Sequence, residues 1–577
     1  MVPAAADSRY PFIDIVSYPP PARLSLPTTS APSFRSSTPS HARSSATAED
    51  LKEKEGRPLV DFLTISEGSP KGLRRQLRAR HIALISIGGV IGTGLFLGTA
   101  QSLATGGPLS LLLSYIVMGV LVWALMTALG EMISHLPLAG GHVTLAARLV
   151  DPAFGLACGW AYCANWLLVM PAELSAAATL MGFWSNANPA GWIAICYVIV
   201  VLINLGGTRV YGELEFWFAS IKIVTIVGLL ILSIVITAGG VPGTKPIGFA
   251  YYRDPGPFQQ FLGISGSVGR FAGFVAVLTR AAYAYVGSEI VSIAAGEARN
   301  PSRSLPQAIR RIIFRIGLFY VAGAFAIGLI VAANDPALSR NDGTALSSPF
   351  VVAIERAGID VLPSVINAAF LTSATSAASS GLYTASRCLY GLSVNSLLPP
   401  AFARLNSYGL PWVSVLTTSA FGLLSFMSAG SHNAAVVFSW LSNFCSVGGI
   451  VTWAAINFCY IRWYHAAKAQ DIPRDFFPYK APFQPYSAYI ALAGFLLVLL
   501  TQGFYLCIDG QWNASDFVTR YLMIFLFPLI YICGRLWLRC KTLSLLEIDF
   551  FSGSRDNDEA AVEKPRTPVK RFLRTLL

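Results

Sequence analysis

The sequence predicts an all-α polytopic membrane protein with about twelve transmembrane helices. Of its 577 residues, 54% are hydrophobic and only 12% are charged, whereas a soluble globular protein carries about 25% charged residues. The mean hydropathy is +0.56. Apolar runs long enough to cross a bilayer recur along the chain and are flanked by basic residues. Together these features exclude a disordered chain, a secreted disulfide scaffold and an ordinary cytosolic enzyme.

Each predicted span is an apolar run of roughly the length that a membrane requires, which is about 20 residues. The fourth run is short, and the sixth contains Arg280. The runs cover 82–104, 109–130, 154–183, 191–206, 216–238, 271–289, 316–333, 361–386, 411–430, 434–461, 486–508 and 521–538.

The distribution of Lys and Arg predicts the orientation. With both termini in the cytosol, the inner flanks hold 21 basic residues and the outer loops hold 6, as the positive-inside rule requires. The net charge of +12 is therefore explained by basic residues that set the membrane orientation, and it predicts no nucleic-acid partner. The sequon at Asn513 falls in the last outer loop, which agrees with this orientation.

Three regions follow from composition. Residues 1–80 form a cytosolic tail rich in Ser, Pro, Ala and Thr without a signal peptide, residues 81–540 form the transmembrane domain, and residues 541–577 form a second cytosolic tail. The tails are candidate sites for phosphorylation and for trafficking or ubiquitin-ligase adaptors. Passive solvated tails explain the same composition equally well.

The first span contains a stretch that is poorly suited to a helix. Four glycines fall between Gly88 and Gly94, and each costs about 1 kcal/mol relative to alanine in a helix interior. An interrupted helix at membrane depth is tolerated only where it lines a cavity or is buried in protein. A ligand site is one interpretation, and close helix packing through a Gly-x-x-x-Gly motif is the other. The candidate residues are Gly88, Gly89, Val90, Ile91, Gly92, Thr93 and Gly94.

The sixth span has a second interruption, in which glycine, serine and a carboxylate follow two aromatic residues. If spans 1–5 and 6–10 are structural repeats, the two interruptions occupy corresponding positions, which in transporters marks the binding site. No repeat is visible residue by residue. The candidates here are Tyr283, Tyr285, Gly287, Ser288 and Glu289.

Two broken helices side by side suit a zwitterion. A helix N-terminus presents free N–H groups that attract a carboxylate, and a C-terminus presents free carbonyl groups that attract an ammonium. An α-amino acid carries both charges, so it is the predicted substrate class.

Four charged residues lie inside predicted spans, where charge is costly and usually functional. Glu173 is a candidate for substrate contact or proton transfer, or an outer-edge residue that touches water. Lys222 either reaches the inner interface or is a buried ammonium in place of a coupling cation. Glu289 either holds the sixth span together or binds protons. Arg280 either leans into the outer vestibule or pairs with a carboxylate such as Glu173.

The motifs of the common enzyme classes are missing from the sequence. There is no P-loop, no His-Glu-x-x-His and no Gly-x-Ser-x-Gly. The six histidines and nine cysteines show no metal-ligand spacing. We therefore predict no enzyme, no cofactor and no metal, and expect an ion gradient or the substrate gradient to drive transport.

These segments resemble the fungal amino acid permeases of the amino acid–polyamine–organocation superfamily over roughly residues 70–545. The resemblance rests on six pieces in order: Leu77-Arg78-Ala79-Arg80-His81-Ile82 with the glycine stretch Gly88–Phe96, Pro171-Ala172-Glu173-Leu174, Gly287-Ser288-Glu289 with Ala295–Pro301, Ser348-Pro349-Phe350, Gly381–Tyr390, and Pro478–Tyr486.

The resemblance implies a five-plus-five inverted-repeat (LeuT-like) fold with two extra helices. It also implies proton-coupled uptake of amino acids across the plasma membrane. The glycine motif would hold the substrate carboxylate, and the sixth-span motif would hold the ammonium, with an aromatic residue as gate. Glu173 and Lys222 match family residues, the latter in place of a coupling cation, and Trp440 matches an aromatic residue near the substrate.

Two departures from the family pattern stand out. Ser288 stands where threonine is more usual, and Arg280 stands where the family mostly has small or polar residues. One hypothesis is that Arg280 favours acidic substrates. The alternative functions are a permease-like amino acid receptor that hardly transports, a membrane-embedded enzyme, an amino acid exchanger, and a γ-aminobutyrate or polyamine transporter.

Overall fold

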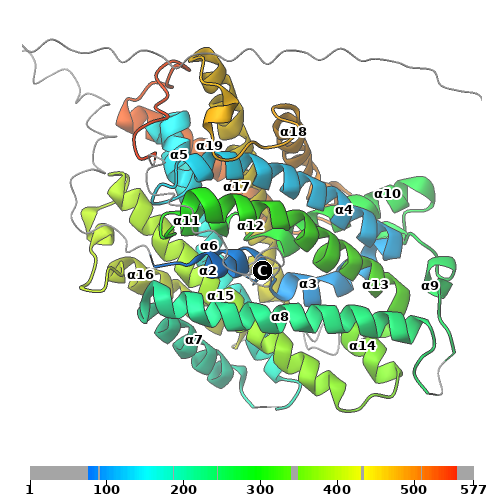
Figure 1. Ribbon diagram of the computed structural model, residues 1–577. Coiled ribbons are helices and arrows are strands. Elements are labelled where there is room, and N and C mark those ends of the chain that lie inside the picture. The colour runs from blue at the N-terminus through cyan, green and yellow to red at the C-terminus, as the bar shows by residue number, and fades with distance from the viewer. Residues whose placement is uncertain are drawn as a thin grey trace, which may run out of the picture. The chain divides into compact units, whose positions relative to one another are not determined.

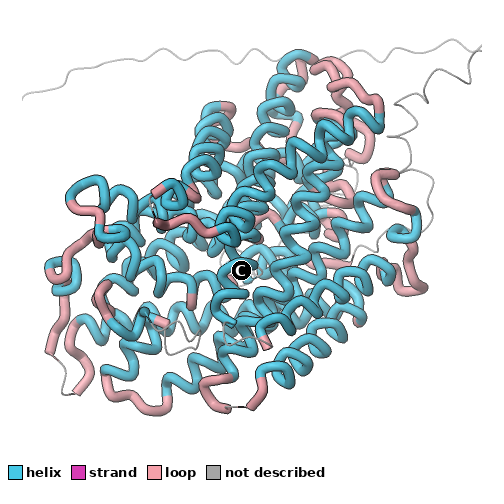
Figure 2. Tube along the Cα trace, turned by 180° about the vertical axis from the view of Figure 1, so that it is seen from behind, coloured by secondary structure: helices cyan, strands magenta, loops and turns pink. Residues whose placement is uncertain are grey.

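The computed structural model describes residues 76–88, 91–185, 187–242, 245–339, 348–429, 434–508 and 510–554. These residues form helices joined by loops, and their only strand-like pairing is an isolated bridge between Leu77 and Ala298. Figure 2 shows the same composition of helices and loops. The all-α prediction is confirmed. Most of the predicted N-terminal tail lies outside the described residues, as does the C-terminal tail after residue 554.

Within the described residues, eight helical segments are long and apolar enough to cross a membrane by length and composition. Two shorter apolar helices accompany them, α7 (Pro189–Leu205) and α16 with its 3-10 extension (Trp412–Ser428). The eight are α4 (Gly98–His135), α6 (Pro152–Met181), α8 (Gly207–Thr237), α10 with α11 (Gly266–Ala295), α12 with α13 (Pro301–Ile330), α17 (Ala434–Ala469), α18 with its 3-10 extension (Tyr486–Cys507) and α19 (Ala514–Leu538).

The remaining predicted spans also coincide with helices. The eighth is α15 (Leu362–Val394). The first consists of α2 (Ala79–Gly88), the short α3 (Thr93–Phe96) and the start of α4. Gly107, with φ of +84°, and Pro108 separate that start from the second span within α4. Each of the twelve apolar runs therefore coincides with all or part of a helix or with consecutive helical segments.

The burial of the helices separates an inner group from a lipid-facing group. In α6 and α17, 83% of the most apolar window is buried inside the protein, whereas in α8 the share is 33% and in α19 it is 11%. Val224 of α8 is 72% exposed and Ile234 is 67% exposed. Such apolar faces are stable against lipid tails and unfavourable in water. The interrupted first span lies inside, and Figure 1 shows α2 and α3 between α8 and the pair α12 and α13.

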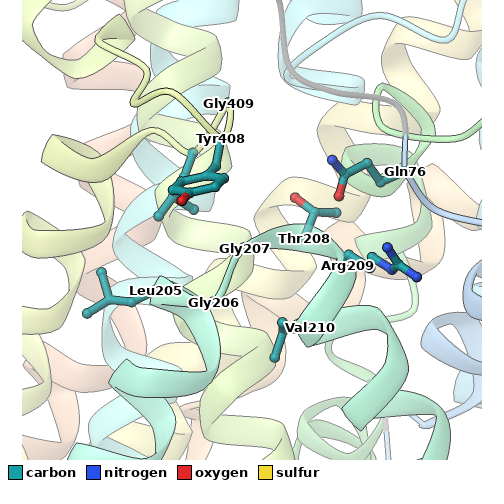
Figure 3. Close-up of a pocket in the computed structure, with 10 residues that line it drawn as sticks. Gln76, Leu205, Gly206, Gly207, Thr208, Arg209, Val210, Tyr408 and Gly409 are labelled. Atoms are coloured by element: carbon teal, nitrogen blue, oxygen red, sulfur yellow. The ribbon is translucent and has the colours of Figure 1, made fainter.

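A cavity of about 430 Å³ opens at the end of the bundle that the sequence assigns to the cytosol. It is lined by the turn between α7 and α8, by Gln76 and by the loop that precedes α16. Figure 3 shows the side chains of Gln76, Thr208 and Tyr408 around this cavity. None of the predicted site residues lines it.

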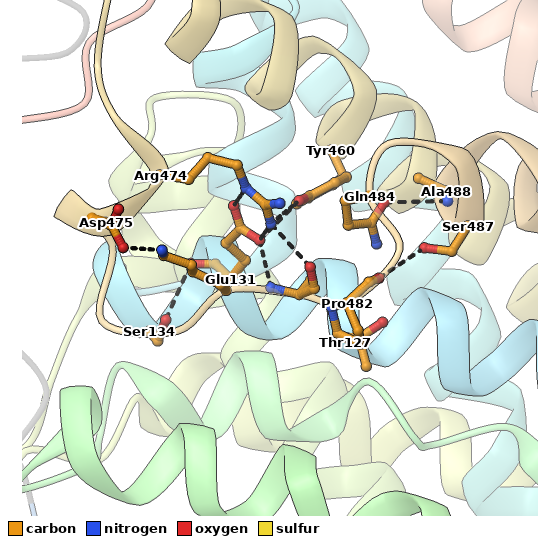
Figure 4. Close-up of polar contacts among 12 residues, drawn as sticks. Thr127, Glu131, Ser134, Tyr460, Arg474, Asp475, Pro482, Gln484, Ser487 and Ala488 are labelled. Atoms are coloured by element: carbon orange, nitrogen blue, oxygen red, sulfur yellow. Dashed lines mark hydrogen bonds and ion pairs between the residues drawn. The ribbon is translucent and has the colours of Figure 1, made fainter. Parts of the chain in front are cut away.

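A buried carboxylate, Glu131 near the end of α4, organises the loop between α17 and α18 (Figure 4). Glu131 is 1% exposed. It accepts hydrogen bonds from Arg474 Nη2 at 2.5 Å, from the backbone N–H of Ala481 at 2.7 Å and from Tyr460 Oη at 2.9 Å. Because a charged acceptor strengthens each bond, this side chain fixes the loop against α4 and α17.

The chain after α19 packs back onto the same end of the bundle. Phe550 is fully buried between the rings of Trp463 and Phe477. Its carbonyl group is hydrogen-bonded to His135 Nε2 at 2.8 Å. Gln470 donates to the carbonyl of Ile548 at 2.8 Å. We call residues 543–554 the C-terminal strap.

A salt bridge attaches the strap to α5 (His142–Leu149). Arg148 Nη2 lies 2.5 Å from Asp549 Oδ2, and Arg148 Nη1 donates to the carbonyl of Ser552 at 2.6 Å. Partial burial alone would raise the pKa of Asp549. The hydrogen bonds from Ser552 and Phe551 and the charge of Arg148 outweigh it and hold this pKa well below its usual range. The ionised form of Asp549, which pairs with Arg148, is therefore favoured.

Truncating Phe550 to alanine tests whether the strap stabilises the folded protein. Phe550→Ala removes a fully buried ring, which typically costs about 3 kcal/mol or more. We expect a lower melting temperature in detergent and faster proteolytic cleavage after α19. Phe551→Ala is the matched control, because Phe551 is 59% exposed. Equal melting temperatures for the two variants would show that the strap adds no stability.

Candidate functional site

The first span is interrupted where the glycines predict it. Helix α2 ends at Gly88, and α3 begins at Thr93 after Gly92, whose backbone is extended with φ of −119° and ψ of −159°. Gly89 and Val90, two of the predicted site residues, lie outside the described residues. An interruption of this kind leaves backbone donors and acceptors without their partners inside the helix.

Side chains from other helices bond to these backbone groups. Ser373 of α15 donates to the carbonyl of Ile91 at 3.0 Å. The N–H of Thr93 lies 3.5 Å from Glu173 Oε2 and points to it. On the inner side, the Arg315 guanidinium donates to the carbonyl of Ser86. The interruption is thus stabilised by polar groups of the protein, as a low-dielectric interior requires.

The sixth span is interrupted between α10 (Gly266–Tyr285) and α11 (Ile290–Ala295). Gly287 has φ of +101°, in the region that residues with a side chain rarely adopt. Ser288 donates to the carbonyl of Tyr285 at 2.9 Å and accepts from Arg315 Nη2 at 3.0 Å. Arg315 therefore bonds to both interrupted spans.

Glu173 connects the two broken helices. It projects from α6, is 4% exposed and accepts a hydrogen bond from Thr93 Oγ1 at 3.0 Å. The hydroxyl of Tyr283 in α10 donates to the same carboxylate oxygen at 3.2 Å. A single ionisable group thus holds α3 and α10 together, and it is not the water-exposed edge residue that the sequence left open.

A small pocket lies around this carboxylate. Its volume is about 20 Å³, enough for about one water molecule. An amino acid therefore needs the surrounding side chains to move. The pocket is lined by Gly92, Gly94, Trp166, Val169, Glu173, Tyr283, Ala284, Val286 and Ala377.

Several residues at this site were not among the predicted site residues, including Trp166, Val169, Ala377 and Phe438. Trp166 and Ala377 line the pocket, and the ring of Phe438 packs edge-on against Tyr283 with 6.2 Å between centroids. Trp166 lies seven residues before Glu173 on α6, two helical turns away and so on the same face. That spacing is the signal that sequence reasoning missed.

Several predicted residues lie away from the pocket. The hydroxyl of Tyr285 donates to the carbonyl of Tyr115 at 2.9 Å, and its ring stacks on Tyr320. Glu289 accepts from the indole N–H of Trp453 at 2.9 Å. Trp440 is half-buried and is not among the residues that line the pocket.

Lys222 is buried inside the bundle. Its side chain is 0% exposed, so it does not reach the inner interface. Its Nζ lies 3.9 Å from Oε1 of Glu215 on the same helix. Lys222 also interacts electrostatically with Glu173. Glu215 was not predicted as a site residue.

Arg280 bonds to the outer part of the first span. Its Nη1 donates to Thr105 Oγ1 at 2.5 Å and to the carbonyl of Gln101 at 3.3 Å. These hydrogen bonds connect α10 to the start of α4 and do not reach Glu173. Arg280 is not among the residues that line the pocket.

The fold and the site define a class. Two interrupted helices that meet at a buried carboxylate inside an α-helical membrane bundle are the arrangement of a secondary membrane transporter. The amino acid permease family model matches residues 81–547, and the chain belongs to this family. It is therefore an integral membrane transporter and not an enzyme.

Curated relatives that are named for different substrates resemble this chain to a similar degree. The basic amino-acid permease of Saccharomyces cerevisiae is 39% identical, over 88% of this chain and 89% of the relative. The proline-specific permease of Emericella nidulans is 39% identical, over 88% and 94%. The dicarboxylic amino acid permease of Saccharomyces cerevisiae is 37% identical, over 85% and 82%. Identity alone therefore does not select among cationic, neutral and acidic substrates.

Adding a methyl group at Gly94 tests the contact between the broken helices. A Cβ there would lie 2.9 Å from Cδ1 of Tyr283 and 3.0 Å from the Cα of Ala284, so α3 and α10 would have to separate. We expect Gly94→Ala to abolish most amino acid uptake while the protein still reaches the membrane. Gly98→Ala is the control, because its Cβ meets nothing within 4 Å. Equal loss in both variants would contradict the close approach.

Removing the Arg280 guanidinium tests whether it selects the substrate. Because Arg280 bonds to Thr105 and Gln101, we expect Arg280→Ala to lower uptake and to leave the order of preference among aspartate, glutamate and neutral amino acids unchanged. Competition assays on radiolabelled uptake measure this. Arg270→Ala, at an exposed position of the same helix, controls for loss of positive charge. A selective loss of acidic substrates would restore the hypothesis that Arg280 recognises them.

Proposed function

We propose that this protein imports amino acids together with protons across the plasma membrane, with both termini in the cytosol. The substrate would bind between the interrupted first and sixth spans. The observation that carries the proposal is the carboxylate of Glu173, which accepts hydrogen bonds from Thr93 and from Tyr283. The same group closes the site and can bind a proton.

The geometry suits an α-amino acid. Backbone N–H groups at the start of α3, close to the pocket-lining Gly92 and Gly94, would favour a substrate carboxylate at the positive end of that helix. The end of α10 offers carbonyl groups and the Tyr283 ring, which favour an ammonium. The substrate side chain would then extend toward Trp166 and Ala377, which line the same pocket.

Proton uptake by Glu173 would favour opening of the pocket between the two interrupted helices. As a carboxylate, Glu173 accepts from both broken helices, and charged acceptors form the stronger hydrogen bonds. Once protonated, it holds Thr93 and Tyr283 less firmly, and one oxygen becomes a donor. The pocket of about 20 Å³ can then enlarge as Tyr283 and Phe438 move aside for the substrate.

The proposed proton coupling is tested with Glu173→Gln, which keeps the shape and removes the titratable group. An amide can neither take up nor release a proton, so its hydrogen bonds to Thr93 and Tyr283 no longer change between a charged and a neutral state. Losing this difference of about 1.5–3 kcal/mol corresponds to about 10- to 100-fold in uptake rate. We expect a loss of this size, and residual uptake that no longer responds to external pH. Radiolabelled uptake in permease-deficient cells, with and without a protonophore, provides the measurement.

Three results would refute parts of this proposal. Wild-type uptake that persists after collapse of the pH gradient would remove proton coupling. Binding without accumulation would indicate an amino acid receptor. Competition assays with all twenty amino acids at two pH values determine the substrate range. If none of the twenty competes, amino acid transport itself is refuted.

A further inference from the structure

A second buried carboxylate faces Lys222. Glu215 of α8 is 1% exposed. Its Oε2 accepts a hydrogen bond from Ser376 Oγ at 2.7 Å. Its Oε1 makes no hydrogen bond within the described part of the chain and lies 3.9 Å from Lys222 Nζ. An oxygen that is buried and lacks a hydrogen bond is unusual, and here it lies beside an ammonium group.

Lys222 therefore interacts with two carboxylates from different helices. Glu215 lies seven residues earlier on α8, two turns closer to the predicted cytosolic end. Glu173 projects from α6 and interacts with Lys222 electrostatically. Ser376, which orients Glu215, directly precedes Ala377 of the pocket lining. Glu215 and the pocket are thus connected through neighbouring residues of α15.

The reason for two carboxylates follows from the cost of burying charge. An ammonium without a counter-charge in a protein interior costs several kcal/mol. If Glu173 takes up a proton, its carboxyl group becomes neutral and no longer balances Lys222. Without a second counter-charge, protonation of Glu173 would leave a buried ammonium uncompensated and would therefore be strongly opposed.

We propose that Glu215 is a second counter-charge for Lys222, which keeps the ammonium balanced while Glu173 carries a proton. This inference rests on the proposed role of Glu173 in proton uptake. The proton passes from external water to Glu173 and leaves to the cytosol, and Glu215 stays ionised throughout. Glu215 is a positioning residue, since it acts on the substrate site through Lys222.

Other titratable groups on the elements packed around Glu215 have partners of their own. His81 of α2 lies near Glu213 at 3.2 Å, and Arg387 of α15 pairs with Glu297 at 3.1 Å. Tyr211 of α8 bonds to Ser380 and stacks on Tyr383. Helix α13 (Ala322–Ile330) contains no titratable side chain, and α7 contributes only Cys196 and Tyr197. Glu355 and Arg356 lie on α14 (Pro349–Arg356), which packs on the outer part of α8.

A multiple-mutant cycle, in which the melting temperature of each variant is measured, tests the proposal without measuring transport. Glu173→Gln imitates the protonated carboxyl group, and Glu215→Gln removes the second charge. Each single variant retains one counter-charge, so we expect small shifts. We expect the double variant to melt at least about 3 °C below the sum of the single shifts, since contacting groups are not additive. Adding Lys222→Met should remove this excess, because no ammonium then remains.

The matched control is Ser376→Ala, which removes the hydrogen bond to Glu215 and keeps its charge. Combined with Glu173→Gln, it should give additive shifts. Additive shifts for Glu173→Gln with Glu215→Gln would overturn the proposal. Expression of the triple variant but not of the double variant would support it.

If neither multiple variant can be purified, the pH profile of uptake decides. Glu215→Gln leaves Glu173 as the sole counter-charge of the pair, so Glu173 takes up its proton only at higher acidity. The profile should shift to lower pH by at least about one unit, and Glu215→Asp should restore it. A lower rate with an unmoved profile would overturn the proposal. Loss of proton dependence in the wild type would refute the proposed function. Where the multiple variants can be purified, the melting cycle then decides the role of Glu215 independently.

Discussion

The interrupted backbone of two buried helices is the constraint on which the rest of this structure depends. Inside a bilayer no water is available, so every freed backbone group needs a protein partner. Ser373 bonds to the carbonyl of Ile91, and Arg315 bonds to the carbonyl of Ser86. Glu173 accepts from the N–H and the hydroxyl of Thr93. The helices that supply these side chains, α6, α12 and α15, must therefore surround the first span, and α6 is accordingly among the most buried helices.

Glu173 differs from Ser373 and Arg315 because protonation changes the hydrogen bonds that it can make. A serine hydroxyl keeps the same hydrogen-bonding capacity at any pH, whereas a carboxylate changes from acceptor to donor when it is protonated. Since Glu173 bonds to both α3 and the Tyr283 hydroxyl of α10, its protonation state and the contact between the broken helices cannot be independent. The charge of Glu173 and the packing of α3 against α10 are thus coupled by the same hydrogen bonds that stabilise the interrupted backbone.

The sequence predicts the helices and both interruptions because hydropathy and glycine content are local properties. It does not predict the partners, because these depend on which face of a distant helix turns inward. Tyr283 and Tyr285 illustrate this limit. Two residues apart on a helix point about 200° apart, so only Tyr283 faces the pocket and Tyr285 bonds to Tyr115. Glu215 was missed for the same reason. Its spacing of seven residues from Lys222 predicts that the two share a helix face, but the sequence does not show that this face turns inward.

The two ends of the bundle are held together in different ways. At the end predicted to face the cytosol, Glu131 binds the loop between α17 and α18, and the C-terminal strap bonds to His135 of α4, to Arg148 of α5 and to Arg462 of α17. At the opposite end, Arg280 connects α10 to the start of α4 through Thr105, so the outer halves of the two broken helices are joined to each other. A pocket of about 20 Å³ can enlarge only where the surrounding bonds are few. In the proposed transport cycle, the site would therefore open by joint movement of the outer halves rather than by separation of the strapped inner end.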